Sequence, residues 1–391
     1  MSNRPKILFL PRWYPHRYDP MPGLFIRRQA EMLTQECDVA VLYVHEDKDA
    51  VNRYEIDSAI EHDVNVVRVY YRIPLKQIPA LTWLIRTFRF FRAHMLGFSL
   101  LRTFHPDLIH VHVLTREGLF ARFIRSFIGI PYVITEHWSR YLPESNGFHG
   151  SLRKYLTRVV VRNASAVMPV SEILKKAMLG FGLKNHNYRV VPNPVDTSLF
   201  TMRETARPEG RSRFIHISCF EDKPKNISGF LTAVKQLSDR RDDFECYLIG
   251  DGPEFDVMKK KAGELGILDS TAFFTGLKTQ EELVKIIKEA DFLVLSSNYE
   301  TFGTVVIECL SCGIPVVATR VGIVPEVINE SNGIIIPTGD VAALADAINR
   351  MLDNYKSYDK ITIRNSIKDR FGNETVSKQL LEIYQKTLNI K

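Results

Sequence analysis

The chain has 391 residues, of which 45% are apolar, and its formal net charge is +7. This length favours two domains, and because no apolar run approaches ~18 residues, a membrane-spanning helix is not expected. Five cysteines without framework spacing indicate a reducing cytoplasm. The apolar run after Lys6 is too short for a signal peptide and reads as a first core strand.

Positive charge is concentrated in the first half of the chain. Residues 1–192 carry 27 Lys and Arg against 16 Asp and Glu, a balance of +11, whereas residues 193–391 carry 25 against 29, a balance of −4. Such an asymmetry fits nucleic acid, an anionic membrane or an anionic substrate. Because no RNA- or DNA-binding signature occurs, nucleic acid is the least favoured partner.

Short apolar runs predict the strands of the first half. They lie at residues 7–10, 37–44, 64–71, 106–112, 131–137 and 164–171. A proline-rich loop follows the first run and contains Gly23, ahead of a helix that starts near Phe25. Phosphate-binding α/β folds place the ligand at the C-terminal end of the first strand, so this loop is a candidate ligand contact. Ser171 is a suitable N-cap for the helix after the last run.

Polar residues at the ends of these strands are candidates for a site. His137 ends the run 131–137, at the strand terminus where α/β sites gather, and His112 is a weaker candidate. A single histidine is more often structural than functional. His137 is proposed as a site residue because it lies at the end of a strand. Asp47 and Asp49 have the DxD spacing of some metal sites, but they lie in an acidic loop and are interpreted as solvated charge.

Residues 81–104 predict an amphipathic helix of unusual composition. Seven Lys or Arg and no Asp or Glu occur between Arg68 and Phe104. Basic, aromatic helices often lie on anionic lipid. Alternatively, the apolar face packs in the core and the basic face is solvated, and both can hold. The apolar face comprises Leu81, Leu84, Ile85, Phe88, Phe91 and Met95, and the arginines on the other faces are Arg86, Arg89 and Arg92.

The second half repeats the strand pattern after a stiff connection. Residues 190–196 contain two prolines that forbid helix. Strands are predicted at 214–218, 244–249 and 272–278, and helices at 342–352 and 377–388. The strand at 244–249 ends in Gly250-Asp251-Gly252, whose glycines allow a tight turn.

Residues 290–336 form the most informative stretch. A strand at 292–295 leads through a polar loop to Glu300, and an apolar helix follows Phe302-Gly303-Thr304. Free N–H groups at that helix start attract phosphate. Glu308 lies on the order of 12 Å along the helix from Glu300, and a charge in so apolar a helix needs a partner. The alternative is that both glutamates are solvated helix-end charges. Cys309 and Cys312 are interpreted as buried small residues.

This spacing resembles the donor-site signature of retaining glycosyltransferases of family 4. The resemblance rests on Glu300-x7-Glu308, with Phe302-Gly303 after the first Glu and Gly313-x-Pro315-Val316-Val317 after the second. It implies the GT-B fold, with two Rossmann-like α/β domains facing across a cleft. Residues 1–192 would form the acceptor-binding domain and 193–374 the donor-binding domain. The C-terminal helix, at about 375–391, would cross back to the first domain.

The resemblance also implies roles for individual residues. Glu300 would contact the donor sugar, His137 would face it, and Lys225 would hold the departing diphosphate. The predicted donor-binding set is Gly23, Cys219, Gly250, Gly252, Gly276, Lys278, Phe302, Gly303, Thr304, Val305 and Glu308. Within this set Glu308 would hold the ribose, and Gly276 and Lys278 would lie near the base. The family usually has an Arg where this chain has Cys219, and losing that cation should weaken donor binding.

The expected function is transfer of a sugar, with retention, from a nucleoside diphosphate sugar to a hydroxyl acceptor in polysaccharide or glycolipid assembly. The acceptor would be a saccharide or a lipid-linked saccharide. No metal and no cofactor are implied. The expected location is cytoplasmic, with peripheral contact to the inner face of an anionic membrane. The alternatives are a non-catalytic nucleotide-sugar-binding GT-B protein, which Cys219 supports, and a nucleotide-sugar 2-epimerase.

Overall fold

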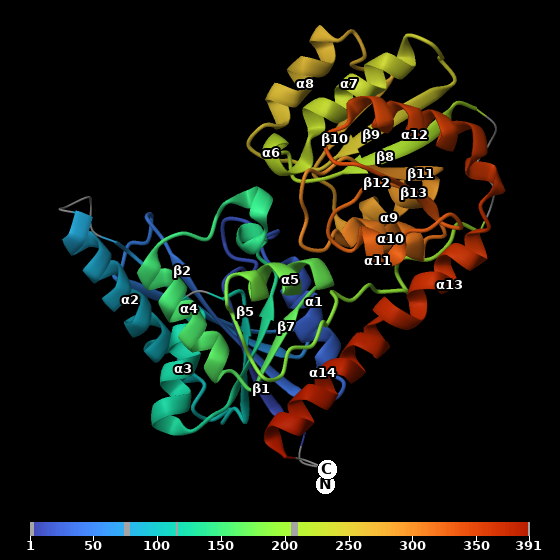
Figure 1. Cartoon of the computed structure of the whole chain (residues 1–391). Coiled ribbons are helices and arrows are strands. Elements are labelled where there is room, and N and C mark those ends of the chain that lie inside the picture. The colour runs from blue at the N-terminus through green and yellow to red at the C-terminus, as the bar shows by residue number, and fades with distance from the viewer. Residues whose placement is uncertain (1–3, 74–78, 115, 205–209, 390–391) are drawn as a thin grey trace.

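The computed structural model describes residues 4–73, 79–114, 116–204 and 210–389 (Figure 1). The N-terminal domain holds a seven-stranded sheet in the order β3-β4-β2-β1-β5-β6-β7, and the C-terminal domain a six-stranded sheet in the order β10-β9-β8-β11-β12-β13. The N-terminal strands are β1 (Lys6–Pro11), β2 (Asp38–Glu46), β3 (Tyr54–Glu61), β4 (Val64–Tyr71), β5 (Leu108–His112), β6 (Tyr132–Glu136) and β7 (Ala166–Pro169). The C-terminal strands are β8 (Ser212–Ile217), β9 (Phe244–Ile249), β10 (Ala272–Gly276), β11 (Phe292–Leu295), β12 (Val316–Thr319) and β13 (Gly333–Ile336).

Helices cover both faces of each sheet, as parallel strands require. In the N-terminal domain they are α1 (Leu24–Leu33), α2 (Pro79–Leu100), α3 (Arg116–Ile128), α4 (Ser151–Asn163) and α5 (Glu172–Gly180). The C-terminal domain has α6 (Asp222–Lys225), α7 (Ile227–Ser238), α8 (Phe255–Glu264), α9 (Gln280–Glu289), α10 (Thr304–Ser311), α11 (Val324–Val327) and α12 (Val341–Asn354). Helices α13 (Lys360–Phe371) and α14 (Asn373–Leu388) end the described chain. This architecture confirms the predicted GT-B fold.

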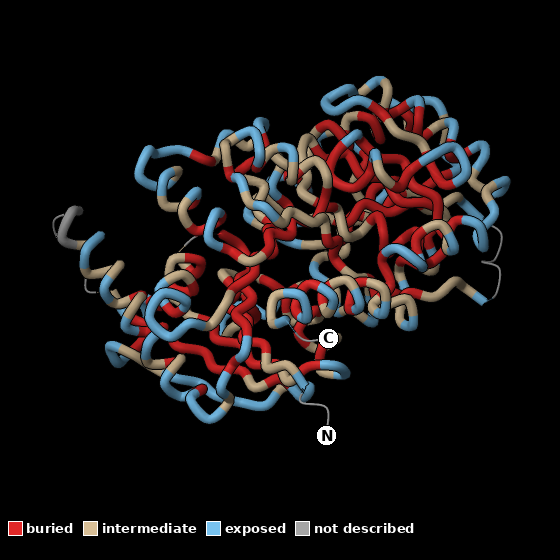
Figure 2. Tube along the Cα trace, turned by 60° about the horizontal axis from the view of Figure 1, so that its bottom comes forward, coloured by how far each residue is buried: buried red, intermediate tan, exposed pale blue. Residues whose placement is uncertain are grey.

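Alternation along β1 separates two apolar layers on either side of the N-terminal sheet. Leu8 and Leu10 belong to the cluster that contains residues of α2, α3 and α4. Ile7 and Phe9 belong to a second cluster with residues of α1 and α14. The inner strands are accordingly buried on both faces (Figure 2). The edge strand β3 is the exception, because most of its residues are exposed.

Helix α14 belongs in space to the N-terminal domain, although it follows the C-terminal domain in sequence (Figure 1). Its buried side chains pack with Ile7 and Phe9 of β1. The Tyr384 hydroxyl lies 2.7 Å from Nδ1 of the fully buried His110 of β5. The predicted return of the C-terminal helix is confirmed. The division at residues 192 and 193 stays a prediction.

Strand β3 is absent from the sequence-based prediction. It pairs antiparallel with β4 through His62 and Asp63, which have φ values of 47° and 65°. A two-residue hairpin turn of this handedness favours Asn-Gly or Asp-Gly, and this chain has neither. Helix α13 was likewise not predicted, and its polar sequence has little amphipathic pattern.

The apolar face predicted for residues 81–104 packs in the core only in part, through the half-buried Phe91. Leu84, Phe88 and Met95 are exposed, whereas Phe90, Ala93 and His94 are the buried side chains of α2. The side chain of Leu81 lies outside the described residues. Helix α2 therefore packs on the sheet through Phe90, Ala93 and His94 and, in part, through Phe91, as the core-packing alternative expects. The outer part of the predicted apolar face is exposed, so the prediction was wrong about which side chains are covered.

Asp47 is also not a solvated charge. Its carboxylate is buried, forms an ion pair with Arg17 and accepts a hydrogen bond from the Tyr18 hydroxyl at 2.8 Å. Burial works to raise its pKa, but these partners outweigh that effect and lower it. The sequence pattern could not show this, because Arg17 comes from the loop after β1.

We expect Tyr384→Phe to lower the free energy of unfolding by about 1–3 kcal/mol, since Nδ1 of buried His110 loses its partner. Urea denaturation of the whole chain measures this. Tyr155→Phe on α4 is the control, because that side chain is 62% exposed. Equal stability of Tyr384→Phe and wild type would show that α14 is not held by this contact.

Candidate active site between the two domains

A cavity of about 740 Å³ lies between the two domains. The N-terminal domain and the connection contribute Trp13, Asp19, Met21, Phe25, His137 and Asn193. The C-terminal domain contributes Ile217, Ser218, Cys219, Lys225, Ile249, Gly250, Asp251, Gly252, Leu277, Lys278, Leu283, Leu295 and residues 300–305. The loops follow the C-terminal ends of β1, β6, β8, β9, β10 and β11, where open α/β sheets bind ligands.

Most of the predicted site residues lie on this cavity. His137, Lys225, Glu300, Cys219, Gly250, Gly252, Lys278 and residues 302–305 line it. Gly23 lies between the lining residues Met21 and Phe25, and Gly276 precedes the lining residue Leu277. Gly276 also accepts a backbone hydrogen bond from Gly250 at 3.0 Å. Gly23, Gly276 and Glu308 are not themselves among the lining residues.

Helix α10 points its N-terminus at the cavity. It begins at Thr304, with Gly303 as N-cap in the left-handed region at φ 92°. The backbone N–H groups of Thr304 and Val305 have no partner within the helix, because they belong to its first turn. The sequence-based span of 12 Å between Glu300 and Glu308 does not hold, since the residues before Thr304 are a loop. A helix start of this kind favours an anionic group in the cavity.

Lys225 and Glu300 form an ion pair across the C-terminal domain's half of the cavity. Burial works to lower the pKa of Lys225, but the Glu300 carboxylate outweighs it and raises that pKa. The Ser297 hydroxyl donates to the same Glu300 oxygen at 2.9 Å. The Ser296 hydroxyl donates to the carbonyl of Lys225 at 2.9 Å. The end of β11 thus fixes both members of the pair.

Two glycines let the loops after β8 and β9 approach each other. A Cβ on Gly250 would lie 1.9 Å from the Ser218 carbonyl oxygen, and Gly250 has φ 127°. A Cβ on Gly252 would lie 2.6 Å from the Phe220 nitrogen. Any side chain at either position would therefore separate the two loops that form this wall of the cavity.

Three histidines are stacked behind the N-terminal wall. His110 and His112 have ring centroids 4.0 Å apart, and those of His112 and His137 are 5.6 Å apart. Burial lowers the pKa of His137 to about 3 and lowers the pKa values of His110 and His112 well below 6.5. All three rings are therefore neutral at pH 7.

One ring nitrogen of His137 has no hydrogen-bond partner. Its Nε2 lies 3.3 Å from Nδ1 of His112, whereas its own Nδ1 is enclosed without a hydrogen-bond partner. When His112 donates in that contact, Nδ1 of His137 carries the hydrogen and is a donor. An unpaired buried polar atom is costly, so a ligand group that pairs with it would be favoured.

Glu136, which the sequence analysis did not single out, positions His137. Its buried carboxylate accepts the backbone N–H groups of Leu114, His137 and Trp138, each at 2.8 Å. Burial raises the pKa of Glu136 to about 7, against the opposing effect of these donors. The carboxylate therefore ties the loop after β6 to the loop after β5.

Glu308 has the partner that its apolar helix requires, and it comes from the other domain. Arg28 Nη1 of α1 donates to Glu308 Oε1 at 3.3 Å. Burial raises the pKa of Glu308 in spite of this arginine. Two further contacts cross between the domains: the Ser171 hydroxyl donates to the Thr301 carbonyl at 2.6 Å, and the Glu172 N–H donates to the Glu326 carboxylate at 3.0 Å.

Cys219 lies on the cavity beside Lys225 and Glu300. Cys219 is exposed, and the protein atoms around its thiol desolvate it in part, which raises the pKa of that thiol against the opposing effect of Lys225. Two other cations, Lys223 of α6 and Arg12 of the loop after β1, are not among the lining residues. The Arg12 guanidinium lies 4.7 Å from the Trp138 ring. Lys278 is a second lysine on the cavity.

Sequence reasoning did not single out Trp13, Asp19 and Asn193, which also line the cavity. Their position in the chain was the available signal, since Trp13 and Asp19 lie in the loop predicted to contact a ligand and Asn193 lies in the connection that contains two prolines. The part of the chain that the structure describes contains no group of three His, Cys, Asp or Glu side chains arranged to hold a metal ion.

We expect the free energy of unfolding to fall as the pH drops from about 6.5 towards 3, because unfolded histidines bind protons that the folded cluster does not. The pKa of His137 is lowered to about 3 in the folded protein. The stability that the neutral ring contributes is therefore fully present above pH 6.5 and is lost progressively as the pH falls from 6.5 towards 3. His137→Asn should make the slope shallower by up to about 1.4 kcal/mol per pH unit. Urea denaturation between pH 7 and 4.5 measures the slope. The exposed His149→Asn is the control, and a slope unchanged by His137→Asn would show that the ring is protonated when folded.

Comparison with known proteins agrees with this geometry. The family "Glycosyl transferase 4-like domain" matches residues 22–194, and "Glycosyl transferases group 1" matches residues 199–368. The chain is 28% identical to the N-acetyl-alpha-D-glucosaminyl L-malate synthase of Bacillus anthracis over 294 residues, which cover 72% of this chain and 75% of that protein. It is 26% identical to the alpha-monoglucosyldiacylglycerol synthase of Streptococcus pneumoniae over 310 residues, 75% of this chain and 66% of that protein.

The fold is shared with solved structures as well. The sucrose-phosphate synthase of Thermosynechococcus elongatus superposes with a TM-score of 0.80 at 20% identity, covering 99% of this chain and 100% of that one. Both halves of the chain thus match glycosyltransferase families, in the order that the GT-B fold requires. The chain belongs to the group 1, family 4-type glycosyltransferases of GT-B fold.

Proposed function

We propose that this glycosyltransferase transfers a sugar, with retention and without a metal ion, from a nucleoside diphosphate sugar to a hydroxyl of a saccharide or lipid-linked saccharide. One observation carries the proposal. A single cavity between the domains holds Lys225, Glu300, His137 and the free N-terminus of α10. Lys225 suits one phosphate and the N-terminus of α10 suits the other. Glu300 suits the hydroxyls of the sugar, and His137 lies where it would contact the sugar from the other side.

The diphosphate would lie against α10. The N–H groups of Thr304 and Val305 and the ammonium group of Lys225 offer positive charge where negative charge develops as the diphosphate leaves. Donor binding would then replace the Lys225–Glu300 ion pair, so that Lys225 turns to phosphate and Glu300 accepts hydrogen bonds from sugar hydroxyls. Both side chains would remain paired, which avoids the cost of an isolated buried charge.

The sugar would lie between Glu300 and His137. A neutral His137 can donate from Nδ1 to a sugar oxygen without adding charge beside the departing diphosphate. In this proposal no side chain forms a covalent bond to the sugar. The leaving phosphate accepts the proton of the acceptor hydroxyl on the same face, which accounts for retention.

The roles of the remaining predicted donor-binding residues are inferred from where they lie relative to the cavity. Gly250, Gly252, Gly276 and Lys278 would surround the nucleoside, and Gly23 would let the loop after β1 approach the phosphates. Glu308 would hold the ribose only if the diol competes with Arg28 for its carboxylate. Cys219 would leave the diphosphate with one cation fewer than the family pattern provides.

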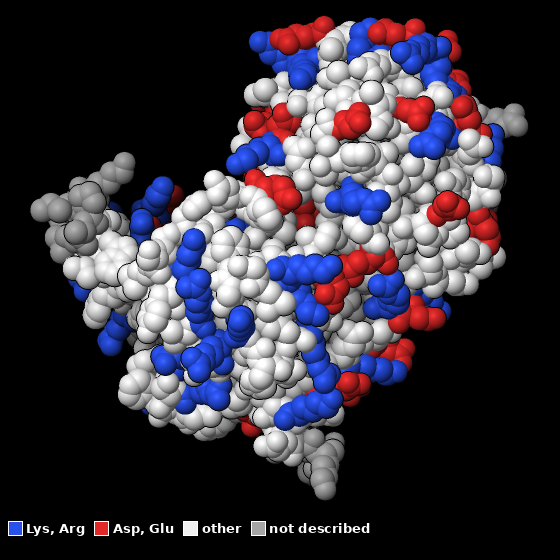
Figure 3. Space-filling view, in the orientation of Figure 1, with Lys and Arg blue, Asp and Glu red and all other residues white. Residues whose placement is uncertain are grey.

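The acceptor side of the molecule favours an anionic lipid surface. Helices α2, α3 and α4 carry ten Lys and Arg, with three each in α2 and α3 and four in α4. Their only acid, Glu117, is buried. Lys and Arg gather over α3 and α4, where Asp and Glu are scarce (Figure 3). Aromatic contacts between Phe91 and Phe120 and between His94 and Phe120 join α2 to α3.

The same helices expose large apolar side chains. They are Trp83, Leu84, Phe88 and Met95 of α2, Phe123, Phe127 and Ile128 of α3, and Leu152 and Tyr155 of α4. Positive charge combined with exposed aromatic residues suits the boundary of an anionic bilayer. None of the described helices is long and apolar enough to cross a bilayer, so the proposed contact is peripheral.

We expect Glu300→Gln to lower kcat/KM for sugar transfer on the order of 10- to 100-fold, because the amide forms weaker hydrogen bonds than a carboxylate in the transition state. Product formation from each nucleotide sugar measures this, with Glu330→Gln on the exposed loop before β13 as control. Donor binding without turnover in the wild-type protein would instead favour the non-catalytic alternative. Equal activity of Glu300→Gln and wild type would remove Glu300 from the site.

Cys219→Arg should lower the KM for the donor by about tenfold, since a charge-assisted hydrogen bond to phosphate contributes about 1.5–3 kcal/mol. The cavity has room for the longer side chain. Steady-state kinetics measures the effect, with the uncharged Cys219→Leu as control. A KM that is unchanged or higher in Cys219→Arg would mean that the diphosphate does not lie beside residue 219.

We expect the protein to sediment with anionic vesicles and not with neutral ones, with binding that weakens as salt is added. Phe88→Ser combined with Phe127→Ser should reduce the bound fraction, because these exposed rings would enter the bilayer boundary. Ile361→Ser is the control, since Ile361 is 59% exposed on α13 of the other domain. No preference for anionic lipid would contradict the proposed surface.

A further inference from the structure

A second cavity, of about 510 Å³, lies in the C-terminal domain at the edge opposite the donor cavity. Ala290 and Asp291 precede β11, and Pro315 precedes β12, so the cavity lies at the N-terminal ends of these parallel strands. The donor cavity lies at their C-terminal ends. Helix α10 connects the two: Thr304 lines the donor cavity, and Cys312, which follows the helix, lines the second one.

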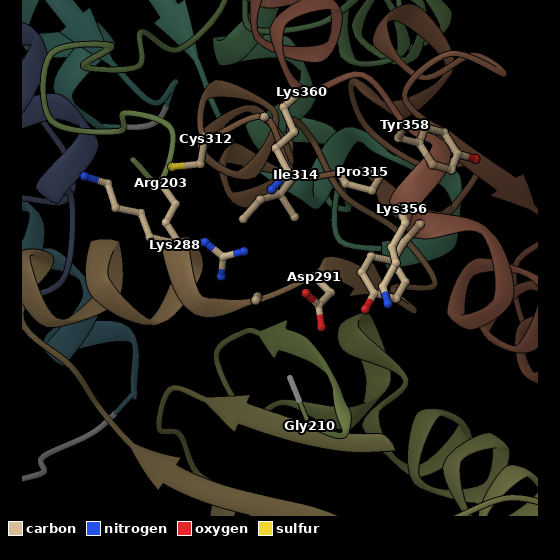
Figure 4. A pocket seen from close by; sticks show the side chains of 13 residues that line it. Arg203, Gly210, Lys288, Asp291, Cys312, Ile314, Pro315, Lys356, Tyr358 and Lys360 are labelled. Carbon is tan, nitrogen blue, oxygen red and sulfur yellow. The ribbon is translucent and has the colours of Figure 1, made fainter. Parts of the chain in front are cut away.

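Among the described residues that line this second cavity, four have cationic side chains and one is an acid (Figure 4). They are Arg203, Lys288, Lys356 and Lys360, and the acid is Asp291. The charged ends of Arg203 and Lys360 point towards the middle of the cavity, whereas Lys288 points away from it (Figure 4). The Asp291 carboxylate accepts the Arg213 N–H at 2.8 Å. Over the described ranges of the chain, none of the four cations forms an ion pair.

Arg203 gives the strongest indication that this cavity binds a ligand. Its Nε and Nη1 are enclosed and have no hydrogen-bond partner. A guanidinium presents several donors in one plane, and it pairs best with a carboxylate or phosphate that accepts two of them. Enclosed donors without a partner cost free energy, and an anion in the cavity would relieve that cost. Other arginines of the C-terminal domain have such partners: Arg213 binds Glu245, and Arg241 binds Asp243.

The lining also includes groups suited to the rest of a small molecule. Tyr355 and Tyr358 contribute rings and hydroxyls from the segment between α12 and α13. A volume of this size is typical of pockets for small molecules. Arg203 with Lys360 would bind the phosphate, Lys356 would add charge at the opposite side, and the tyrosines would contact a sugar or base.

We propose that this cavity is a second ligand site, which binds a small phosphorylated compound through Arg203 and Lys360. The proposal does not depend on the assignment of the donor cavity. The phosphate is the shared chemistry, and the compound that carries it can be a sugar phosphate or a nucleotide.

Calorimetric titration of the whole protein with pyrophosphate, in the presence of saturating UDP, tests this site. UDP is added to fill the donor cavity, and the titration is repeated with GDP and with ADP in its place, so that the nucleotide that this protein binds is present in one of the three series. We expect pyrophosphate to bind to wild type in the presence of UDP, and Arg203→Gln with Lys360→Gln to weaken it at least tenfold. The control variant, Lys259→Gln with Lys285→Gln, removes the same charge from exposed positions on α8 and α9 and should bind within twofold of wild type.

Lys356→Gln gives a second variant that does not affect folding, because Lys356 is exposed. It should weaken pyrophosphate several-fold while leaving UDP binding unchanged. Titrations with glucose 6-phosphate and with UMP under the same conditions distinguish the two sources of phosphate. Absence of pyrophosphate binding, its loss when UDP is present, or equal binding by the Arg203→Gln with Lys360→Gln variant would overturn the proposal.

Discussion

The ion pair between Lys225 and Glu300 is the interaction on which the donor cavity depends. It joins two loops that follow neighbouring strands, since β8 and β11 are adjacent in the sheet. Ser296 and Ser297 hold both partners in place from the end of β11. The pair keeps two charges balanced in a partly buried place. In the proposed function, a ligand with both phosphate and hydroxyl groups replaces it. An anionic ligand without hydroxyls would satisfy only Lys225, and this difference favours a sugar nucleotide over a simple anion.

The two domains contribute different chemistry to the cavity. The C-terminal domain supplies cations, Glu300 and backbone donors, whereas the N-terminal domain supplies Asp19 and otherwise neutral groups such as His137 and Trp13. The neutrality of His137 follows from burial behind the loop that Glu136 ties down. The contacts between Arg28 and Glu308 and between Ser171 and Thr301 hold the two halves at the distance the cavity needs. Because the cavity is formed by residues of both domains, its shape depends on the distance between the domains.

Much of this was predictable from the sequence because parallel α/β sheets are regular. Buried strands give continuous apolar runs, and site residues follow them at the strand ends, as Glu300 and His137 do. The motif from Glu300 to Val317 identified the family. What could not be predicted depends on contacts between distant segments. Arg28 as the partner of Glu308, and Arg17 as that of Asp47, are separated from them along the chain. The outward face of α2 was also unpredictable, because its helical periodicity marks an apolar stripe without saying what covers it.

The measurement that tests the central claim most directly is thermal unfolding with UDP, GDP and ADP, each with and without EDTA. A nucleotide at 100 times its dissociation constant should stabilise the protein by about 2.7 kcal/mol. We predict that nucleotides of one base raise the unfolding midpoint equally with and without EDTA, and that Lys225→Ala reduces the rise. If no nucleotide raises the midpoint, or if the rise requires a divalent metal, the account of the donor cavity is contradicted.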